Sequence, residues 1–382
     1  MQVGRSAAKD ARLAGEEAAT QALAGQDRAS LLVVFCSDAY DLDLLIRTIS
    51  ERSGAAPLIG CSTAGEIAAT GPGDASVVVS AFGGEGFSVA TAIATHASGR
   101  LREASAEVAG AVARVPDQPN RVLMLLSDGL SGDQQEVVRG AYSVVGAAVP
   151  LVGGCAGDDL KMKRTYQFHG TQVVTDAVVG AAIASDAPMG IGVRHGWRRV
   201  GEPMLVTGSA DNRVLTLDDK PALDIYLDRL QVPAEARTDA AAFTRFAITH
   251  PLGLSRRSGE EVRFVGEANF KDRSLVCIAG VPQGGLAWFM EGDNSSVLAA
   301  TDAACTDALA PLNGRPPVGF LAFDCIARRG VLGDEGIKTE VARIGLHAGG
   351  APIAGFYTYG EIARTNGISG FHNQTLVILA LS

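Results

Sequence analysis

The sequence predicts an α/β protein in which repeated βαβ units form mixed sheets flanked by helices, with two closely packed modules and a strand-rich insertion. Three observations support this fold class. Three apolar runs of five to seven residues are each followed by a segment with helical periodicity and then by a second apolar run that begins with proline. One loop sequence recurs towards both ends of the chain. Between its copies, short apolar runs alternate with glycine, as expected for strands.

The first βαβ unit shows the pattern most clearly. Residues 31–37 form an apolar run that suits a buried parallel strand. Apolar side chains then recur at i, i+3, i+4 and i+7 from Leu42, with Asp41 as the expected N-cap and Gly54 directly after the helix. The other two units repeat this order, with strands at 122–128 and 318–324, helices at 134–145 and around 337–344, and a further helix before each of the three units at 7–24, 101–112 and 296–309.

A glycine-rich loop is the most informative repeat. Residues 56–68 and 351–363 share the string A-P-x-x-G-x-x-T-x-G-E-I-A, and residues 150–158 form a shorter third copy that ends in Asp158. Each copy lies where the second strand of its unit should end. The repetition of a whole strand–helix–strand–loop pattern predicts three related βαβ crossovers.

The insertion between the second and third copies has a different character. We expect strands over 164–200, a hairpin over 204–217 around Asp211, a short helix over 221–230 with Pro221 at N1, and four or five strands over 240–290. A polar turn at Asp218 marks the expected module boundary, which gives modules of 1–217 and 218–382.

Composition excludes several function classes. The chain of 382 residues has 33 Lys and Arg against 42 Asp and Glu, a formal net charge of −9, so an electrostatic nucleic-acid binder is not expected. The first residues lack the apolar run of a signal peptide, and no apolar segment has the character of a membrane helix, so we expect a cytoplasmic protein. The six cysteines lack the close spacing of a zinc or redox motif, so reduced thiols are expected.

The repeated loop offers groups that can bind a small ligand. Its glycines leave backbone N–H groups accessible, Thr63 and Thr358 add hydroxyls, and Glu66 and Glu361 add carboxylates. Ligands of open α/β sheets bind beyond the carboxyl ends of the strands, where these loops belong. If the loops converge, either the pKa of one carboxyl rises or a cation lies between the two carboxylates, and an ammonium or guanidinium group of a ligand would supply that cation. An amino-acid-like ligand fits this chemistry.

A purely structural role for the loop remains open at this point. A glutamate after glycine often accepts hydrogen bonds from its own loop, and the glycines are also explained by helix–sheet packing. An enzyme is a further alternative, with Cys61, Cys155 or Cys325 as nucleophile or with Glu66 and Glu361 as an acid–base pair. The sequence shows no triad, metal-ligand cluster or phosphate-binding loop to support catalysis, and a pure interaction scaffold is a third alternative.

These strings resemble the FIST sensory-domain family, with an amino-terminal and a carboxy-terminal FIST module over nearly the whole chain. The resemblance is carried by residues 60–67, 153–158, 221–224, 323–328, 355–362 and 372–375. It implies small-ligand sensing in signal transduction, with amino acids as suggested ligands. Some free-standing bacterial members are similar to haem-binding nitric-oxide sensors that regulate a separate histidine kinase or cyclic-dinucleotide enzyme.

We therefore expect a sensor without catalytic residues that signals through a separate protein, such as a histidine kinase or a diguanylate cyclase or phosphodiesterase. The haem-sensor version is the alternative, and His372 would then be the axial ligand. No other cofactor, metal, nucleic acid or membrane is expected. The predicted ligand-binding residues are Cys61, Thr63, Gly65, Glu66, Cys155, Asp158, Cys325, Arg328, Thr358, Gly360, Glu361, His372 and Asn373.

Overall fold

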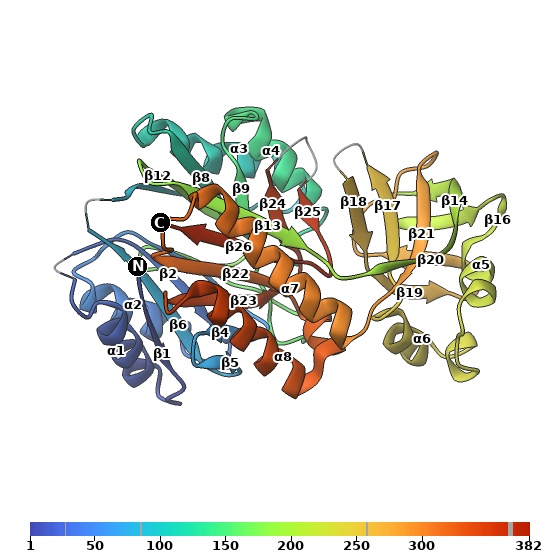
Figure 1. The fold of residues 1–382 in the computed structure, drawn as a ribbon, viewed down its shortest axis with the longest axis horizontal. Helices are drawn as coiled ribbons and strands as arrows, with labels where there is room; N and C mark the ends of the chain where they lie inside the picture. The colour runs from blue at the N-terminus through green and yellow to red at the C-terminus, as the bar shows by residue number, and fades with distance from the viewer. Residues whose placement is uncertain (27, 85, 257–258, 366–369) are drawn as a thin grey trace.

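The computed structural model describes residues 1–26, 28–84, 86–256, 259–365 and 370–382. It shows three mixed six-stranded sheets covered by helices, and a fourth, antiparallel sheet that forms a separate lobe on the right of Figure 1. The α/β class with several mixed sheets and flanking helices is confirmed. None of the helices in the described ranges is both long and apolar enough to cross a membrane.

The three six-stranded sheets are built from three chain segments with the same order of elements. The first comprises β1 (Gln2–Ser6), α1 (Ala11–Ala22), β2 (Ala29–Cys36), α2 (Leu42–Arg52), β3 (Leu58–Ser62), β4 (Glu66–Ala68), β5 (Gly71–Gly73) and β6 (Val77–Gly83). The second comprises β7 (Ser88–Thr95), α3 (Leu101–Ala109), β8 (Asn120–Ser127), α4 (Gln135–Val145), β9 (Leu151–Cys155), β10 (Gln167–His169), β11 (Gln172–Val174) and β12 (Ala177–Ser185). The third comprises β13 (Met189–Arg194), α7 (Asn294–Leu309), β22 (Gly319–Cys325), α8 (Ile326–Ala348), β23 (Ile353–Thr358), β24 (Glu361–Arg364), β25 (Phe371–His372) and β26 (Leu376–Leu381).

The lobe is inserted between β13 and α7 of the third segment. It contains β14 (Arg198–Ala210), β15 (Arg213–Leu217), β16 (Lys220–Pro221), α5 (Ala222–Arg229), α6 (Ala240–Ala247), β17 (Leu252–Arg256), β18 (Gly259–Arg263), β19 (Val265–Asn269), β20 (Ser274–Cys277) and β21 (Leu286–Glu291). Asp218, where the sequence analysis places the module boundary, lies in the turn between β15 and β16 of this sheet.

The four or five strands expected over 240–290 are confirmed as β17 to β21, but two local details of the insertion differ from the expectation. The segment from residue 240 begins with helix α6 rather than a strand, because Asp239 caps it by accepting from the Ala242 amide and Phe243 packs into the core of the lobe. Pro221 is the N-cap of α5 and not its first helical residue. The hairpin of β14 and β15 is confirmed, with its turn at Asp211.

A hairpin passes from each segment to the sheet of another. Strand β4 follows β3 but pairs with β23, β24 follows β23 but pairs with β9, and β10 follows β9 but pairs with β3. The three repeated loops are the connections that make these crossings. They therefore meet at the carboxyl ends of the parallel pairs β2–β3, β8–β9 and β22–β23.

Alternation along the central strands divides the core into layers. Leu31, Val33 and Phe35 of β2 face a central core shared by all three sheets, whereas Leu32 and Val34 face the layer of α1 and α2. The ring of Phe35 packs against those of Phe323 and Phe356 from the third segment, with centroids 6.2 and 4.6 Å apart. Pairs α3–α4 and α7–α8 cover the other two sheets (Figure 1).

The first glycine of each loop copy is explained by packing. A Cβ at Gly60, Gly153 or Gly355 would collide with a backbone carbonyl oxygen of the neighbouring parallel strand, in each case at the corresponding position. Only glycine allows that approach without moving the strands.

Candidate functional site

A cavity of about 600 Å³ opens where the loops after the parallel strands meet the first turns of α8. We call it the loop cavity. Segments from different parts of the chain line it: Ser37, Ala39, Ala64, Asp74, Ala75, Asp159, Leu160, Ile326, Arg329, Gly330, Gly333 and Asp334. Its location beyond the carboxyl ends of β2, β3 and β9 is the usual place for ligands of open α/β sheets.

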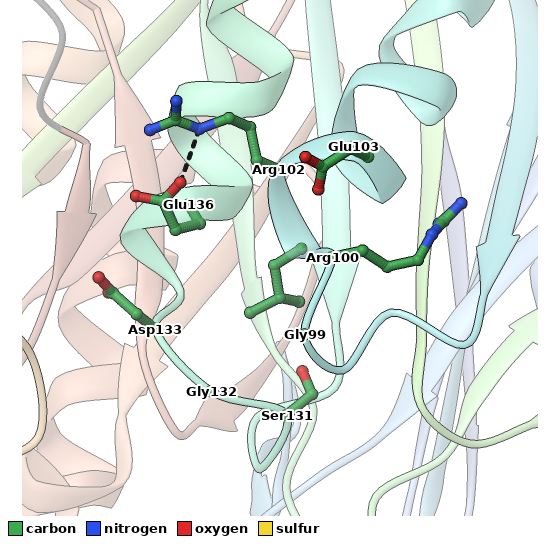
Figure 2. A pocket seen from close by; sticks show the side chains of 9 residues that line it. Gly99, Arg100, Arg102, Glu103, Ser131, Gly132, Asp133 and Glu136 are labelled. Carbon is green, nitrogen blue, oxygen red and sulfur yellow. Dashed lines mark hydrogen bonds and ion pairs between the residues drawn. The ribbon is translucent and has the colours of Figure 1, made fainter.

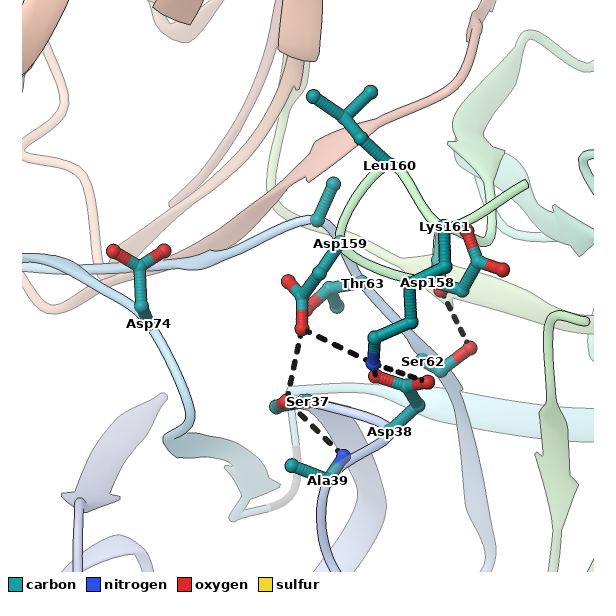
Figure 3. Close-up of polar contacts among 12 residues, drawn as sticks. Ser37, Asp38, Ala39, Ser62, Thr63, Asp74, Asp158, Asp159, Leu160 and Lys161 are labelled. Carbon is teal, nitrogen blue, oxygen red and sulfur yellow. Dashed lines mark hydrogen bonds and ion pairs between the residues drawn. The ribbon is translucent and has the colours of Figure 1, made fainter. Parts of the chain in front are cut away.

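Asp159 is a carboxylate of the cavity wall without a close ion pair. Its Oδ2 accepts from the Ser37 hydroxyl at 3.2 Å and lies 3.9 Å from the Lys161 ammonium. That ammonium is held by Asp38 at 2.6 Å instead, as Figure 3 shows. Burial, followed by the nearby charge of Asp38, raises the pKa of Asp159. A cationic ligand group beside Asp159 would offset both the cost of burying this carboxylate and its repulsion by Asp38.

Arg329 is the cation among the described residues that line the cavity. Its two terminal nitrogens hold the carboxylate of Asp74 at 2.7 and 2.8 Å, which lowers the pKa of Asp74, and one also donates to the Ala64 carbonyl. The guanidinium lies 5.1 Å from the centre of the Tyr357 ring. Asp334 makes no hydrogen bond or ion pair with the described part of the chain, so the cavity carries more negative than positive charge.

The loop that carries Asp159 is held in a strained shape. Asp159, Leu160 and Met162 all adopt positive φ, between 52° and 61°. The Tyr359 hydroxyl accepts from the amides of Asp158 and Leu160 and donates to Asp158 Oδ1. The Asp158 carboxylate in turn accepts from the amides of residues 162, 163 and 164. These contacts fix the position of Asp159 at the cavity.

None of the residues predicted to bind ligand lines the loop cavity. Five of them are sequence neighbours of lining residues: Thr63 and Gly65 flank Ala64, Asp158 precedes Asp159, and Cys325 and Arg328 precede Ile326 and Arg329. Apart from His372, whose side chain is partly exposed, these predicted residues are buried. The loops converge as expected, since the Ser62 hydroxyl donates to the Gly157 carbonyl and the Thr358 hydroxyl donates to the Cys155 carbonyl.

Glu66 and Glu361 are each held within their own segment. Glu66 accepts from the Thr63 hydroxyl at 2.5 Å and from the amide and hydroxyl of Ser76. Burial raises the pKa of Glu66 to about 7, although the hydrogen bonds from Ser76 and Thr63 oppose that shift. Glu361 Oε2 accepts from the Thr375 amide, and burial raises the pKa of Glu361 well above its usual value. These hydrogen bonds give both glutamates a structural role within their own segments.

The structure changes which residue of the third loop copy corresponds to Glu66 and Glu361. Register places Gln167, not Asp158, at the position of Glu66 and Glu361, since all three open the hairpin that crosses to another sheet. The connection in the second segment is longer than in the others, and Asp158 lies in the extra residues. Burial alone would raise the pKa of Asp158, but hydrogen bonds from Tyr359 and the loop amides lower it.

The environment of the cysteines does not favour a nucleophilic role for Cys61, Cys155 or Cys325. All six cysteines are free and buried. Burial raises the pKa of Cys61 and Cys325 well above the usual value and that of Cys155 to about 12. These thiols therefore stay protonated at neutral pH, unlike activated nucleophiles.

The residues at the cavity do not fit haem. No histidine, cysteine, methionine or tyrosine is among the described residues that line it. His372 lies elsewhere, in β25, with its Nε2 hydrogen-bonded to the Ala363 carbonyl at 2.9 Å, and burial lowers the pKa of His372. Within the described ranges, no group of three or more His, Cys, Asp or Glu side chains is arranged to hold a metal ion.

A second cavity, of about 460 Å³, lies between the first turns of α3 and α4 (Figure 2). Arg102 crosses it to pair with Glu136 at 2.6 Å, and Glu136 also accepts from Arg139. Arg102 and Glu136 pair with each other, Arg100 pairs with Glu107 outside the cavity, and Glu103 and Asp133 are exposed, so the described residues that line this cavity present no desolvated charge to a ligand.

Several predicted site residues share loops with the lining of the loop cavity, but the lining residues there are neighbours of the predicted ones. Asp159 lies in a loop with positive φ and Arg329 lies in the first turn of α8, so the alternation of an extended strand does not predict which of their side chains reaches the cavity. Asp159 and Arg329 are each one residue from a predicted position. The signal in the sequence was that both are charged residues directly after a predicted one, Asp159 after Asp158 and Arg329 after Arg328.

Comparisons with known proteins agree with this architecture. The model of the FIST N domain matches residues 30–220, and that of the FIST C domain matches residues 222–364. The chain is 29% identical over 237 residues to the uncharacterized protein Rv0628c of Mycobacterium tuberculosis, and 28% identical over 241 residues to the uncharacterized protein Mb0898c of Mycobacterium bovis. Over 153 residues it is 26% identical to the uncharacterized protein MJ1623 of Methanocaldococcus jannaschii.

These similarities are partial in length. The match with Rv0628c covers 59% of this chain and 59% of that protein, and the match with Mb0898c covers 59% and 58%. The match with MJ1623 covers 38% of this chain and 30% of that protein. The chain thus spans less than two thirds of the length of the curated relatives it matches.

Proposed function

Because the chain belongs to the FIST family, whose domains are associated with small-ligand sensing in signal transduction, we propose that it is a sensor that binds an amino-acid-like ligand in the loop cavity and signals through a separate protein. The observation that carries the ligand class is Asp159. Its carboxylate is 31% exposed, accepts from the Ser37 hydroxyl and lies near Asp38, while the ammonium of Lys161 is 3.9 Å away and is held more closely by Asp38. A ligand ammonium group supplies the missing positive charge.

Arg329 supports the other half of an amino-acid-like ligand. Its partner Asp74 has a side chain that is 66% exposed, whereas Arg329 is 20% exposed. Asp74 can therefore turn into solvent at small cost and leave the guanidinium to a ligand carboxylate, which it would hold in the same bidentate way. Ala39, Leu160 and Ile326 provide apolar contact for a short side chain.

A separate output protein is part of the proposal, with a histidine kinase or a cyclic-dinucleotide enzyme as the partner that the family resemblance implies. Two apolar side chains on the Asp159 loop support contact with a partner beside the ligand. Leu160 is 61% exposed and Met162 is 58% exposed. Since the same loop carries Asp159, a ligand there would act directly on this surface.

Thermal unfolding with a panel of amino acids, primary amines and dicarboxylates tests the ligand class. We expect stabilisation by compounds that carry both an ammonium and a carboxylate, and a loss of at least about tenfold in affinity for Asp159→Asn, because this variant removes the charge that accepts from the ligand ammonium. Asp133→Asn, which removes the same charge at the second cavity, is the matched control and should bind as the original chain does. Equal affinity in both variants would refute the assignment.

A further inference from the structure

Three corresponding side chains, Glu66, Gln167 and Glu361, share one structural task. Each accepts a backbone amide at the start of the last strand of its segment. Ser76 donates to Glu66, Ala177 donates to Gln167, and Thr375 donates to Glu361, at 3.2, 3.2 and 3.1 Å. This task accounts for one polar atom of each side chain.

The second polar atoms of these three side chains differ in their hydrogen-bond partners. Glu66 Oε1 accepts from the Thr63 hydroxyl, and Gln167 Nε2 donates to the Thr165 hydroxyl. Glu361 Oε1 has no N–H or O–H partner among the residues that the structure describes, and the Cys325 thiol interacts with this carboxylate and opposes the rise in its pKa that burial causes. The two hydroxyls that would serve it are used elsewhere: Thr358 donates to the carbonyls of Cys155 and Gly360, and Thr375 donates to the Asn373 carbonyl.

Further unpaired polar atoms lie between His372, which pairs with Glu361 across β24 and β25, and Thr375, whose amide donates to Glu361. Asn373 is 1% exposed, and neither Oδ1 nor Nδ2 has a partner in the described ranges. Gln374 is fully buried, and its Oε1 is likewise unpaired there. Both residues directly precede Thr375, the residue bound to Glu361. We call Glu361, Asn373 and Gln374 the Glu361 cluster. Burying so many unpaired groups is unfavourable unless a bound molecule pairs with them.

We propose that the Glu361 cluster is a second binding site, separate from the loop cavity, that takes the ammonium group of a small primary amine. Three acceptor oxygens, Glu361 Oε1, Asn373 Oδ1 and Gln374 Oε1, match the three N–H donors of an ammonium group. The Glu361 carboxylate balances the charge. The nearby Arg328 does not compete for it, because Arg328 is already paired with Asp324 and Glu340.

The cluster also joins the inserted lobe to the rest of the molecule. Gln374 Nε2 donates to the Ile248 carbonyl of the lobe at 2.7 Å, and the Trp197 indole donates to the Gln374 carbonyl at 3.0 Å. An ammonium group bound to Gln374 Oε1 would therefore strengthen this junction. Binding at this site should stabilise the whole chain against unfolding.

Thermal unfolding in chloride salts of equal ionic strength tests the proposal. Ammonium and methylammonium should raise the Tm in a saturable way, while potassium, which has the size of ammonium but no N–H donors, and tetramethylammonium should not. Glu361→Gln should lose the effect. Glu66→Gln, the same change at the corresponding position with both oxygens paired, should keep it. Asp159→Asn should also keep it, which separates this site from the loop cavity.

Direct binding provides a measurement that does not depend on the folding of a variant. Equilibrium dialysis of the unaltered chain with ¹⁵N-ammonium should give saturable binding that remains in Asp159→Asn, and Asn373→Leu should weaken it at least tenfold. An equal effect of potassium, no saturable ammonium binding, or undiminished binding in Glu361→Gln and Asn373→Leu would each overturn the proposal.

Discussion

At the scale of single residues, the hydrogen-bond and ion-pair partners of a buried group decide whether its charged or its neutral form is favoured. Arg328 is fully buried, yet its pKa stays high because Glu340 and Asp324 accept its hydrogen bonds at 2.5 and 2.7 Å. Glu66 is buried among hydroxyls and an amide without a cation, so its protonated form is favoured instead. The two environments predict opposite responses to substitution.

Replacing Glu66 should change the pH dependence of stability. The folded chain raises the pKa of Glu66 from 4.5 to about 7, so it binds more protons than the unfolded chain in that window. Stability is therefore lost as the pH rises from 4.5 through 7, by up to about 3 kcal/mol. Glu66→Gln should remove this loss. Urea unfolding at pH 5 and pH 8 measures it, and parallel losses in both proteins would contradict the assigned pKa.

Replacing Arg328 should be far more damaging than replacing its neighbour. Arg328→Met leaves Asp324 and Glu340 buried without their cation and should cost about 3–5 kcal/mol. Arg329→Met removes an ion pair with the exposed Asp74 and should cost about 1 kcal/mol or less. Denaturant unfolding of the two variants gives the comparison. Similar losses would show that burial of the Arg328 ion pairs is not the deciding factor.

At the scale of elements, the crossing hairpins organise the molecule. The glycine that starts each loop copy lets two parallel strands approach closely, and the residues after it lead into another sheet. In the second segment the connection is longer, and Asp158 and Tyr359 hold its extra residues in place. That longer connection is what brings Asp159 to the loop cavity.

The close approach can be tested with one methyl group. Gly355→Ala places a Cβ against the Ala322 carbonyl and should destabilise the chain by about 2–3 kcal/mol. Gly110→Ala is a suitable control, because Gly110 has φ −56° and its Cβ would meet no heavy atom within 4 Å. It should change stability by less than about 0.5 kcal/mol. Thermal unfolding that ranks the two variants equally would contradict the packing argument.

At the scale of the whole molecule, sequence patterns predicted the strand–helix–strand units well because periodicity and capping are local. Asp41, for example, caps α2 as expected, accepting from the Leu44 amide. The exchange of hairpins between sheets depends on contacts between distant segments, so no local pattern indicated it. For the same reason the sequence placed the acid of the second copy at Asp158 and not Gln167 in the pairing, and missed Asp159 and Arg329.

The central claim is that Asp159 receives the ammonium group of a ligand in the loop cavity. Calorimetric titration of the best ligand from the amino-acid panel into the original chain, Asp159→Asn and Asp133→Asn tests it most directly. We expect one ligand per chain, unchanged affinity in Asp133→Asn, and affinity lowered at least about tenfold in Asp159→Asn. Undiminished affinity in correctly folded Asp159→Asn would contradict the claim.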